Sequence, residues 1–595
     1  MQSKPRREMN PDYMWDLTPI FKDIEAWKAA YELAEREVQA LDTLPGTLAY
    51  SEQHLKEGLD KIFSAQEKVE RVYAYAFLAK SSDNGDHASQ DMEARAIRLL
   101  VALETATAFV NPEILSIPAE MLEQWLKWDG LKTYRHLISD IMRSGSHTLD
   151  ARGERLLAML GDVAQTPGAT FDMFESVDMR FPDVHDESGK DVPLTHGGFT
   201  VFRESRSQAV RREAFEVYFA GYGNYIHTLA SIYGGSVKLN CFNARAREFS
   251  GACEAALFGN NVPVSLYDGL IESVHAALPT MRRYLNLRRH ALGLDELHLY
   301  DLYAPMVEDV DYPMPYENAR ALVLEALKPL GEEYQALLNR AFEEKWIDVY
   351  ENQGKSTGAF SMGVYGVHPY VMLNFAGKLD DAFTLAHELG HSMHSYFSDR
   401  DQDYANHDYR IFVAEVASTV NEVLLTKYLL KREKDEKRRA YILNHFLEGF
   451  RTTVFRQTLF AEFERKAHEL YQSGTPLTAQ NLNALYHELN ALYYDGATID
   501  TFADVEWARI PHFYRAFYVY QYATGFSSAV AIASRILETG RADHYLSFLS
   551  TGGSDYPIEE LKLAGVDLTR PETVMQAMKV FKDTLDELEE ILMKS

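Results

Sequence analysis

Cysteine is nearly absent from this chain of 595 residues, which contains only Cys241 and Cys253. Two cysteines cannot form the disulfide framework of a secreted scaffold, and their spacing does not fit a cysteine-ligated metal site. Positive charge is also scarce: the chain has 60 lysines and arginines and 88 aspartates and glutamates, which gives a net charge of −28. A surface that negative repels nucleic-acid phosphates and anionic lipid headgroups. We therefore expect a cytoplasmic protein with no nucleic-acid or membrane partner, and no sequence feature indicates an obligate protein partner.

Long apolar runs are few. Basic residues near the N-terminus are followed by Asn10-Pro11-Asp12 and not by an apolar segment, so the sequence predicts no secretory signal. Residues 516–534 carry no charge and are long enough to cross a bilayer at about 1.5 Å per residue. That segment also holds glutamine, serines and three tyrosines, which hydrocarbon would penalise. We interpret it as a buried helix.

The remaining composition, 46% hydrophobic and 25% charged, is that of a globular protein, and the length predicts two or three lobes. Apolar residues recur at helical spacing through most of the chain, which predicts a mainly α fold. Strand patterns occur in only two places. Residues 176–181 and 198–202 flank a turn at 186–190, and we expect a β-hairpin there that ends an N-terminal helical lobe, 1–200, before a catalytic domain, 201–595. Residues 358–375 predict a small sheet beside the next helix.

The segment DDAFTLAHELGH, residues 380–391, contains the pattern H-E-x-x-H. We expect Asp380 or Asp381 to cap a helix that continues through the motif. On a helix, His387 and His391 lie about 40° apart with about 6 Å of rise, so both can reach one tetrahedral Zn²⁺ at about 2.0–2.1 Å. Glu388 falls beside them, close enough to hold a water at the metal.

A second helix is predicted over residues 411–422, where two carboxylates share one face of an apolar surface. Glu415 and Glu422 are seven residues apart, and a carboxylate in such a surface needs a partner. A zinc site needs one more ligand from outside the first helix, and Glu415, 24 residues after His391, is the best placed. Glu422 is then placed to orient an imidazole. The sequence thus predicts one Zn²⁺ per chain.

Other histidines and tyrosines are less specific. His394 lies about 10 Å further along the first helix than His387, too far to share the metal, so we expect it to orient other groups or fill the core. His368 is expected to be structural or to face substrate. In residues 507–525, three tyrosines recur at four-residue steps and are expected to share a face, either as core aromatics or as donors to an oxyanion. They are Tyr514, Tyr518 and Tyr522.

Several segments resemble oligoendopeptidase F, of the thimet-oligopeptidase family of zinc metallopeptidases. They are HELGHSMH at 387–394, AEVASTVNE at 414–422, IPHFY at 510–514 with FYVYQYATG at 517–525, GKSTGAFS at 354–361 and YDLYAP at 300–305. The resemblance implies zinc bound by His387, His391 and Glu415, and Glu388 as general base.

The same resemblance implies that His512 lies near the scissile carbonyl, with Tyr518 and Tyr522 as oxyanion donors and Tyr514 as the alternative. It also implies a two-lobed helical shell around a deep channel, which would restrict substrates to short unfolded peptides. We therefore expect a zinc endopeptidase whose partners are short peptides.

Three other functions are considered. Residues 354–357, Gly-Lys-Ser-Thr, match the end of a P-loop, but its first glycine would fall at Val349, so nucleotide binding is disfavoured. A metallocarboxypeptidase would keep the zinc and cut C-terminal residues. A non-catalytic helical binding protein would hold His387 and His391 in its core and contain no metal.

Overall fold

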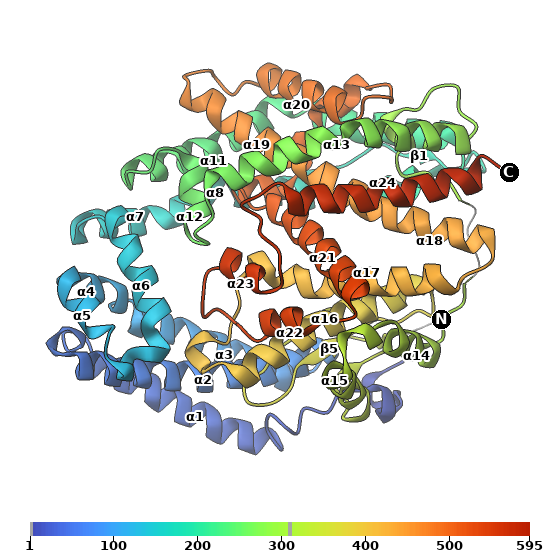
Figure 1. Cartoon of the computed structure of the whole chain (residues 1–595). Coiled ribbons are helices and arrows are strands. Elements are labelled where there is room, and N and C mark those ends of the chain that lie inside the picture. The colour runs from blue at the N-terminus through green and yellow to red at the C-terminus, as the bar shows by residue number, and fades with distance from the viewer. Residues whose placement is uncertain (1–3, 308–311, 595) are drawn as a thin grey trace. The chain divides into compact units, whose positions relative to one another are not determined.

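The computed structural model describes residues 4–307 and 312–594, and the described chain is mainly helical, as predicted (Figure 1). Contacts divide it into two units. The first comprises Met1–Ser146, Tyr312–Leu425 and Ile532–Val566, and the second comprises His147–Asp311, Thr426–Ala531 and Asp567–Ser595. This division differs from the cut at residue 200 expected from the sequence. Residue 200 lies inside helix α9, and each unit is assembled from three separate stretches because packing does not follow chain order.

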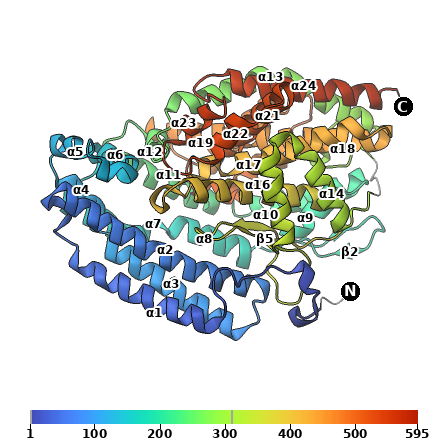
Figure 2. The same ribbon diagram turned by 60° about the horizontal axis from the view of Figure 1, so that its bottom comes forward.

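The first unit begins with long helices that pack side by side. Trp27 of α1 is fully buried, and its indole nitrogen donates to the Val72 carbonyl of α2 at 2.9 Å. Figures 1 and 2 show α1, α2 and α3 as neighbours. The helices of this unit are α1 (Ile24–Ala40), α2 (Glu52–Ser82), α3 (His87–Thr107), α4 (Val110–Ser116), α5 (Ala119–Trp125), α6 (Arg135–Ser144), α14 (Tyr316–Ala326), α15 (Glu332–Glu343), α16 (Leu379–Asp401), α22 (Asp543–Leu549) and α23 (Pro557–Leu563).

The predicted small sheet is present in the first unit, and it has three strands. Strand β4 (Phe360–Met362) pairs antiparallel with β5 (Tyr370–Met372), and β3 (Ile347–Asp348) pairs parallel with the other edge of β5. Strand β4 is therefore an edge strand. It lies against α16, where the hydroxyls of Ser361 and Ser392 are 2.8 Å apart.

The segment that resembles a P-loop has a structural role. The Lys355 ammonium is buried and forms an ion pair with Asp348 at 2.7 Å. It also donates to the carbonyl oxygens of Tyr350 at 2.8 Å and Leu373 at 2.5 Å. The N–H donors of the Lys355 ammonium thus bind groups at β3 and just after β5. This lysine does not face a phosphate site.

The second unit is built mostly from amphipathic helices, and α13 and α24 lie along each other within it (Figure 1). They are α7 (Ala151–Ala164), α8 (Thr166–Met173), α9 (His196–Arg203), α10 (Gln208–Gly223), α11 (Ile226–Ala246), α12 (Ala252–Phe258), α13 (Val264–Ala291), α18 (Glu436–Gly449), α19 (Arg456–Gln472), α20 (Ala479–Tyr493) and α24 (Glu572–Leu592). Helices α17 (Ile411–Arg432) and α21 (Tyr520–Thr539) each begin in one unit and end in the other.

The hairpin expected near residue 200 exists, but its strands are not the predicted segments. Strand β1 (Val184–His185) pairs with β2 (Asp191–Val192), and the Asp186 carboxylate accepts the N–H groups of Ser188 and Lys190 across the turn. Residues 176–178 lie in a π-helical turn, and residues 198–202 lie in α9. Short apolar runs do not distinguish strand from helix, and Thr195, which caps α9, was the overlooked signal.

Residues 516–534 do not form one uninterrupted helix, since α21 begins at Tyr520. Thr524, Ser527 and Ser528 of α21 are buried within the protein. Another described segment, His87–Ser116, has the length and apolar composition of a membrane-crossing helix. It comprises α3, a turn and α4, and Leu99 and Leu103 pack into the core of the first unit. Length and composition alone do not place this segment in a membrane.

Candidate active site

Helix α16 carries the two histidines of the H-E-x-x-H motif. It begins at Leu379, and the Asp381 carboxylate accepts the N–H group of Lys378 at 2.7 Å, so Lys378 and not Asp380 or Asp381 is the capping position. Phe383 and Leu389 are among the buried residues that fix the helix in the first unit. This packing determines the direction in which His387 and His391 point.

Helices α16 and α17 approach closely at the motif. A Cβ atom on Gly390 would lie 2.5 Å from Ser418 Cα and 2.6 Å from the Ala417 carbonyl oxygen, so only glycine fits there. The Asn421 amide donates to the Ala386 carbonyl at 3.0 Å and accepts from the Tyr334 hydroxyl at 3.0 Å. These contacts hold the carboxylates of α17 beside the histidines of α16.

Three donor atoms converge between the helices. His387 Nε2 lies 3.2 Å from His391 Nε2, and Glu415 Oε2 lies 3.4 Å and 3.6 Å from these two nitrogens. A tetrahedron around zinc, with ligands at about 2.0–2.1 Å, has edges of about 3.3–3.4 Å. The donor set and its spacing therefore fit one zinc ion, and they would leave the fourth position for a water or a substrate.

The charges around this cluster favour a cation. His387 Nδ1 is hydrogen bonded to Glu422, which leaves Nε2 as the atom facing Glu415. Burial lowers the pKa of His387, but the hydrogen bond to Glu422 and the neighbouring carboxylates outweigh it and raise the pKa to about 9. Contact with His391 lowers the pKa of Glu415 to about 2. A metal ion competes with a proton for these same lone pairs.

Glu388 lies beside the cluster without belonging to it. Its side chain is buried, and burial raises its pKa, although the charges of His387 and His391 act in the opposite direction. A carboxylate whose pKa is raised toward neutrality is a stronger proton acceptor than one in water.

The second unit contains a group of aromatic side chains around His512. The Tyr522 hydroxyl is 3.4 Å from His512 Nε2, and the Tyr518 ring lies parallel to the imidazole with centroids 6.2 Å apart. Tyr514 is not part of this group, because its ring stacks on Phe171 at 4.7 Å. The structure thus brings His512, Tyr518 and Tyr522 together within that unit.

The expected common face of the three tyrosines is incorrect. Tyr514 ends a 3-10 helix, Pro511–Tyr514, whereas Tyr522 belongs to α21. Between them Phe517 adopts a left-handed conformation with φ of 56°, and its N–H donates to the buried Glu464 carboxylate at 3.0 Å. The chain is not helical at Phe517, which donates to a residue 53 positions away in sequence, and this contact cannot be found from local spacing.

Comparison with known proteins identifies the family. The model of peptidase family M3 matches residues 201–580, and a second model, oligopeptidase F, matches residues 113–181. The chain belongs to peptidase family M3. Oligopeptidase PepF of Bacillus subtilis (strain 168) is 44% identical over 597 residues, covering 100% of this chain and 89% of that protein. The predicted resemblance to oligoendopeptidase F is confirmed.

Solved structures agree with this assignment. A solved chain from Chlamydophila abortus has a TM-score of 0.93 at 32% identity, covering 99% of this chain and 100% of the other. The oligoendopeptidase-F structure from Enterococcus faecium has a TM-score of 0.74 at 37% identity, covering 96% of this chain and 99% of the other. This M3 chain is therefore a peptidase with the helical fold of oligoendopeptidase F.

Two other histidines of the M3 peptidase are structural. His394 is fully buried and stacks on Tyr409 with ring centroids 3.7 Å apart, and burial lowers its pKa to about 3. His368 stacks on Trp346 at 4.7 Å, and its Nδ1 is 2.9 Å from the Pro369 carbonyl. Both are neutral core residues and not members of the donor cluster.

Two residues that position parts of the site were not predicted from the sequence. Asn421 links α17 to α16, and Glu464 binds the backbone of Phe517. Asn421 had a visible signal, because it is a polar residue next to Glu422 in a stretch of α17 that is rich in apolar residues. Glu464 had none, since its helix also carries exposed charges and its partner is distant in the chain.

Proposed function

We propose that this M3 peptidase is a zinc-dependent endopeptidase that hydrolyses internal bonds of short unfolded peptides. The observation that carries the proposal is the trio of His387, His391 and Glu415 donor atoms, spaced 3.2–3.6 Å apart as in a tetrahedral site. Bound there, zinc would polarise a water and the scissile carbonyl. The low cysteine count and the charge of −28 support a cytoplasmic enzyme that acts on peptides and binds no nucleic acid or membrane.

The residues of this chain supply proton transfer and orientation. Glu388, buried beside the histidines, accepts the proton of the attacking water and returns it to the leaving amine. Glu422 accepts the Nδ1 proton of His387 and so keeps the Nε2 lone pair directed at the site. His512, Tyr518 and Tyr522, which lie together in the second unit, donate to the oxyanion of the substrate.

Substrate backbone is expected to bind along β4. This strand is at the edge of its sheet and lies against α16, so its free backbone groups can pair with an extended peptide. Such pairing requires an unfolded segment, which supports short peptides and not folded proteins as substrates.

The decisive experiment is turnover of a quenched fluorescent peptide by the Glu388→Gln variant. Glutamine keeps the shape of the side chain but cannot accept the proton, so kcat should fall by about 10²–10⁴ while zinc content and peptide binding are retained. Glu25→Gln, an exposed position on α1, is the control and should leave kcat unchanged. Near-parental cleavage by zinc-replete Glu388→Gln would show that the base lies elsewhere.

Product mapping distinguishes the remaining functions. A peptide blocked at both ends should be cut internally, and mass spectrometry should find two fragments. Cleavage of only unblocked C-termini would indicate a carboxypeptidase. Purified protein without stoichiometric metal would favour the non-catalytic alternative, and equal cleavage of a native folded protein would contradict the short-peptide substrate class.

A further inference from the structure

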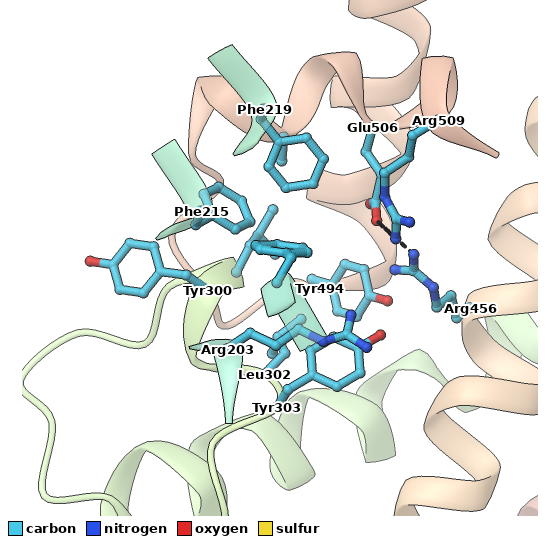
Figure 3. A pocket seen from close by; sticks show the side chains of 13 residues that line it. Arg203, Phe215, Phe219, Tyr300, Leu302, Tyr303, Arg456, Tyr494, Glu506 and Arg509 are labelled. Atoms are coloured by element: carbon cyan, nitrogen blue, oxygen red, sulfur yellow. Dashed lines mark hydrogen bonds and ion pairs between the residues drawn. The ribbon is translucent and has the colours of Figure 1, made fainter. Parts of the chain in front are cut away.

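The second unit contains a small pocket surrounded by guanidinium groups (Figure 3). Its volume is about 30 Å³, and its polar lining comes from five separate segments of the chain. Arg203 ends α9, Tyr303 follows the 3-10 helix Leu299–Asp301, Arg456 begins α19, Tyr494 follows α20, and Glu506 and Arg509 belong to the 3-10 helix Thr501–Arg509.

Positive charge exceeds negative charge around this pocket. Glu506 is the acceptor for both Arg456, at 2.6 Å, and Arg509, at 3.2 Å. Glu448 is likewise shared, by Arg288 and Arg451. Among the described residues, Arg203 makes no ion pair with any carboxylate. Among the described residues that line the pocket, three arginines, Arg203, Arg456 and Arg509, stand against one glutamate, Glu506. A guanidinium cannot lose its charge by deprotonation.

The unbalanced charge is concentrated at Tyr303. The guanidinium carbon of Arg203 lies 3.7 Å from the centre of its ring, and that of Arg451 lies 4.4 Å from it. Burial raises the pKa of Tyr303, but the charges of Arg456, Arg451 and Arg203 outweigh it and lower the pKa to about 8. The lowered pKa shows how strongly the surrounding guanidinium charges act at this ring.

Polar atoms at the pocket lack partners. The Tyr494 side chain is 3% exposed, and its hydroxyl has no hydrogen-bond partner among the described residues. The Nε atoms of Arg203 and Arg509 and Nη1 of Arg451 are also buried without a partner in that part of the chain. Figure 3 shows the Arg203 guanidinium over the Tyr303 ring, with Tyr494 beside them at the pocket. A buried donor left unpaired is costly, so a ligand that accepts hydrogen bonds is expected.

We propose that this pocket binds one small monovalent anion of the halide class, with Arg203 and Tyr494 as its donors. An acceptor-only ion would balance part of the excess charge and satisfy the unpaired donors together. A cavity of about 30 Å³ is large enough for an occupant of the size of a water molecule, and a halide ion is of similar size. The site lies within the second unit and is independent of the proposed zinc chemistry.

Direct binding is tested with bromide as the probe. Crystals of the full chain grown in sodium bromide should show one anomalous peak within hydrogen-bonding distance of Arg203 and Tyr494. In solution, chloride should raise the Tm by about 1–3 °C over sodium gluconate at equal ionic strength, because the ion binds only the folded state. Equal Tm values in both salts, or a pocket that contains only water, would overturn the proposal.

Substitution of Arg203 gives a signature that general destabilisation cannot produce. In gluconate, Arg203→Met should be at least as stable as the parent, because it removes a partly buried charge that makes no ion pair among the described residues, and it should lose the chloride response. Tyr494→Phe should keep the fold and weaken chloride binding by several-fold. Arg212→Met, on an exposed arginine paired with Glu216, should respond to chloride as the parent does. An undiminished chloride response in both Arg203→Met and Tyr494→Phe would refute the site.

Discussion

Gly390→Ala tests whether close packing of α16 and α17 sets the metal geometry. The added Cβ would lie 2.5 Å from Ser418 Cα and 2.6 Å from the Ala417 carbonyl oxygen, whereas carbon atoms in contact are about 3.5–4.0 Å apart. The helices must therefore separate by about 1 Å. Overpacking of this kind costs about 1–3 kcal/mol of stability.

The same shift would act on the ligands. Glu415 Oε2 is 3.6 Å from His391 Nε2, and separation of the helices by about 1 Å would take it beyond the edge of a zinc tetrahedron. We expect at least tenfold weaker zinc binding, since even residues that only support ligands contribute about 10–100-fold. Turnover should fall by about 10²-fold, the usual effect of a misplacement of about 1 Å.

Three measurements decide this prediction: zinc affinity by competition with a chelator, turnover of a fluorescent peptide, and denaturant unfolding. The control is Gly269→Ala in α13, where the added Cβ meets no atom within 4 Å in the described part of the chain outside its two chain neighbours and the backbone of its own helix. That variant should be more stable by about 0.5–1 kcal/mol and fully active. Parental zinc affinity and turnover in Gly390→Ala would refute the claim that helix spacing controls the site.

Three further predictions concern single side chains. Glu415→Ala should lower zinc affinity by more than about 100-fold, measured as metal content after dialysis. Tyr522→Phe should lower kcat by about 10²–10³ with little change in KM, whereas Tyr514→Phe should change Tm alone. Burial raises the pKa of Glu464 to about 8. As the pH rises from about 5.5 to 8.5, the free energy of unfolding of the parent should therefore fall by on the order of 3 kcal/mol relative to that of Glu464→Gln. Stability falls as the pH rises, because the carboxyl group of the unfolded chain ionises near about pH 4.3 while that of the folded chain keeps its proton.

Each of these has a contrary outcome. Full zinc occupancy in Glu415→Ala would remove that residue from the ligand set. A change in Tm without a change in turnover would make Tyr522 a core residue. A stability difference between the parent and Glu464→Gln that is constant over the pH range would show that Glu464 is ionised in the folded protein.

The sequence predicted those parts of the site that depend on helical spacing alone. His387, His391, Glu415 and Glu422 were placed by the rule that residues three, four or seven apart share a face, and α16 and α17 are regular helices there. The tyrosines were misjudged because the chain is not a continuous helix between Tyr514 and Tyr522.

Contacts between distant segments account for the other differences. Glu464 stabilises a left-handed residue 53 positions away, and arginines from separate segments meet around Tyr303. The division into two units also depends on which distant helices pack together, so a linear boundary at residue 200 did not describe it. Spacing rules contain no information on such contacts.

The discontinuous first unit has a consequence for the order of events during synthesis. The last stretch of that unit, Ile532–Val566, supplies Phe548, whose ring centroid is 5.2 Å from that of His394, and Tyr545, whose hydroxyl is 3.5 Å from the Ala417 carbonyl. These contacts pack α22 against α16 and α17. At about 5–20 residues per second, the ribosome completes this stretch about 8–30 s after Glu415. A nascent chain therefore carries its H-E-x-x-H segment for many seconds before Tyr545 and Phe548 can pack against α16 and α17, so the first unit is complete only after residue 566 has been synthesised.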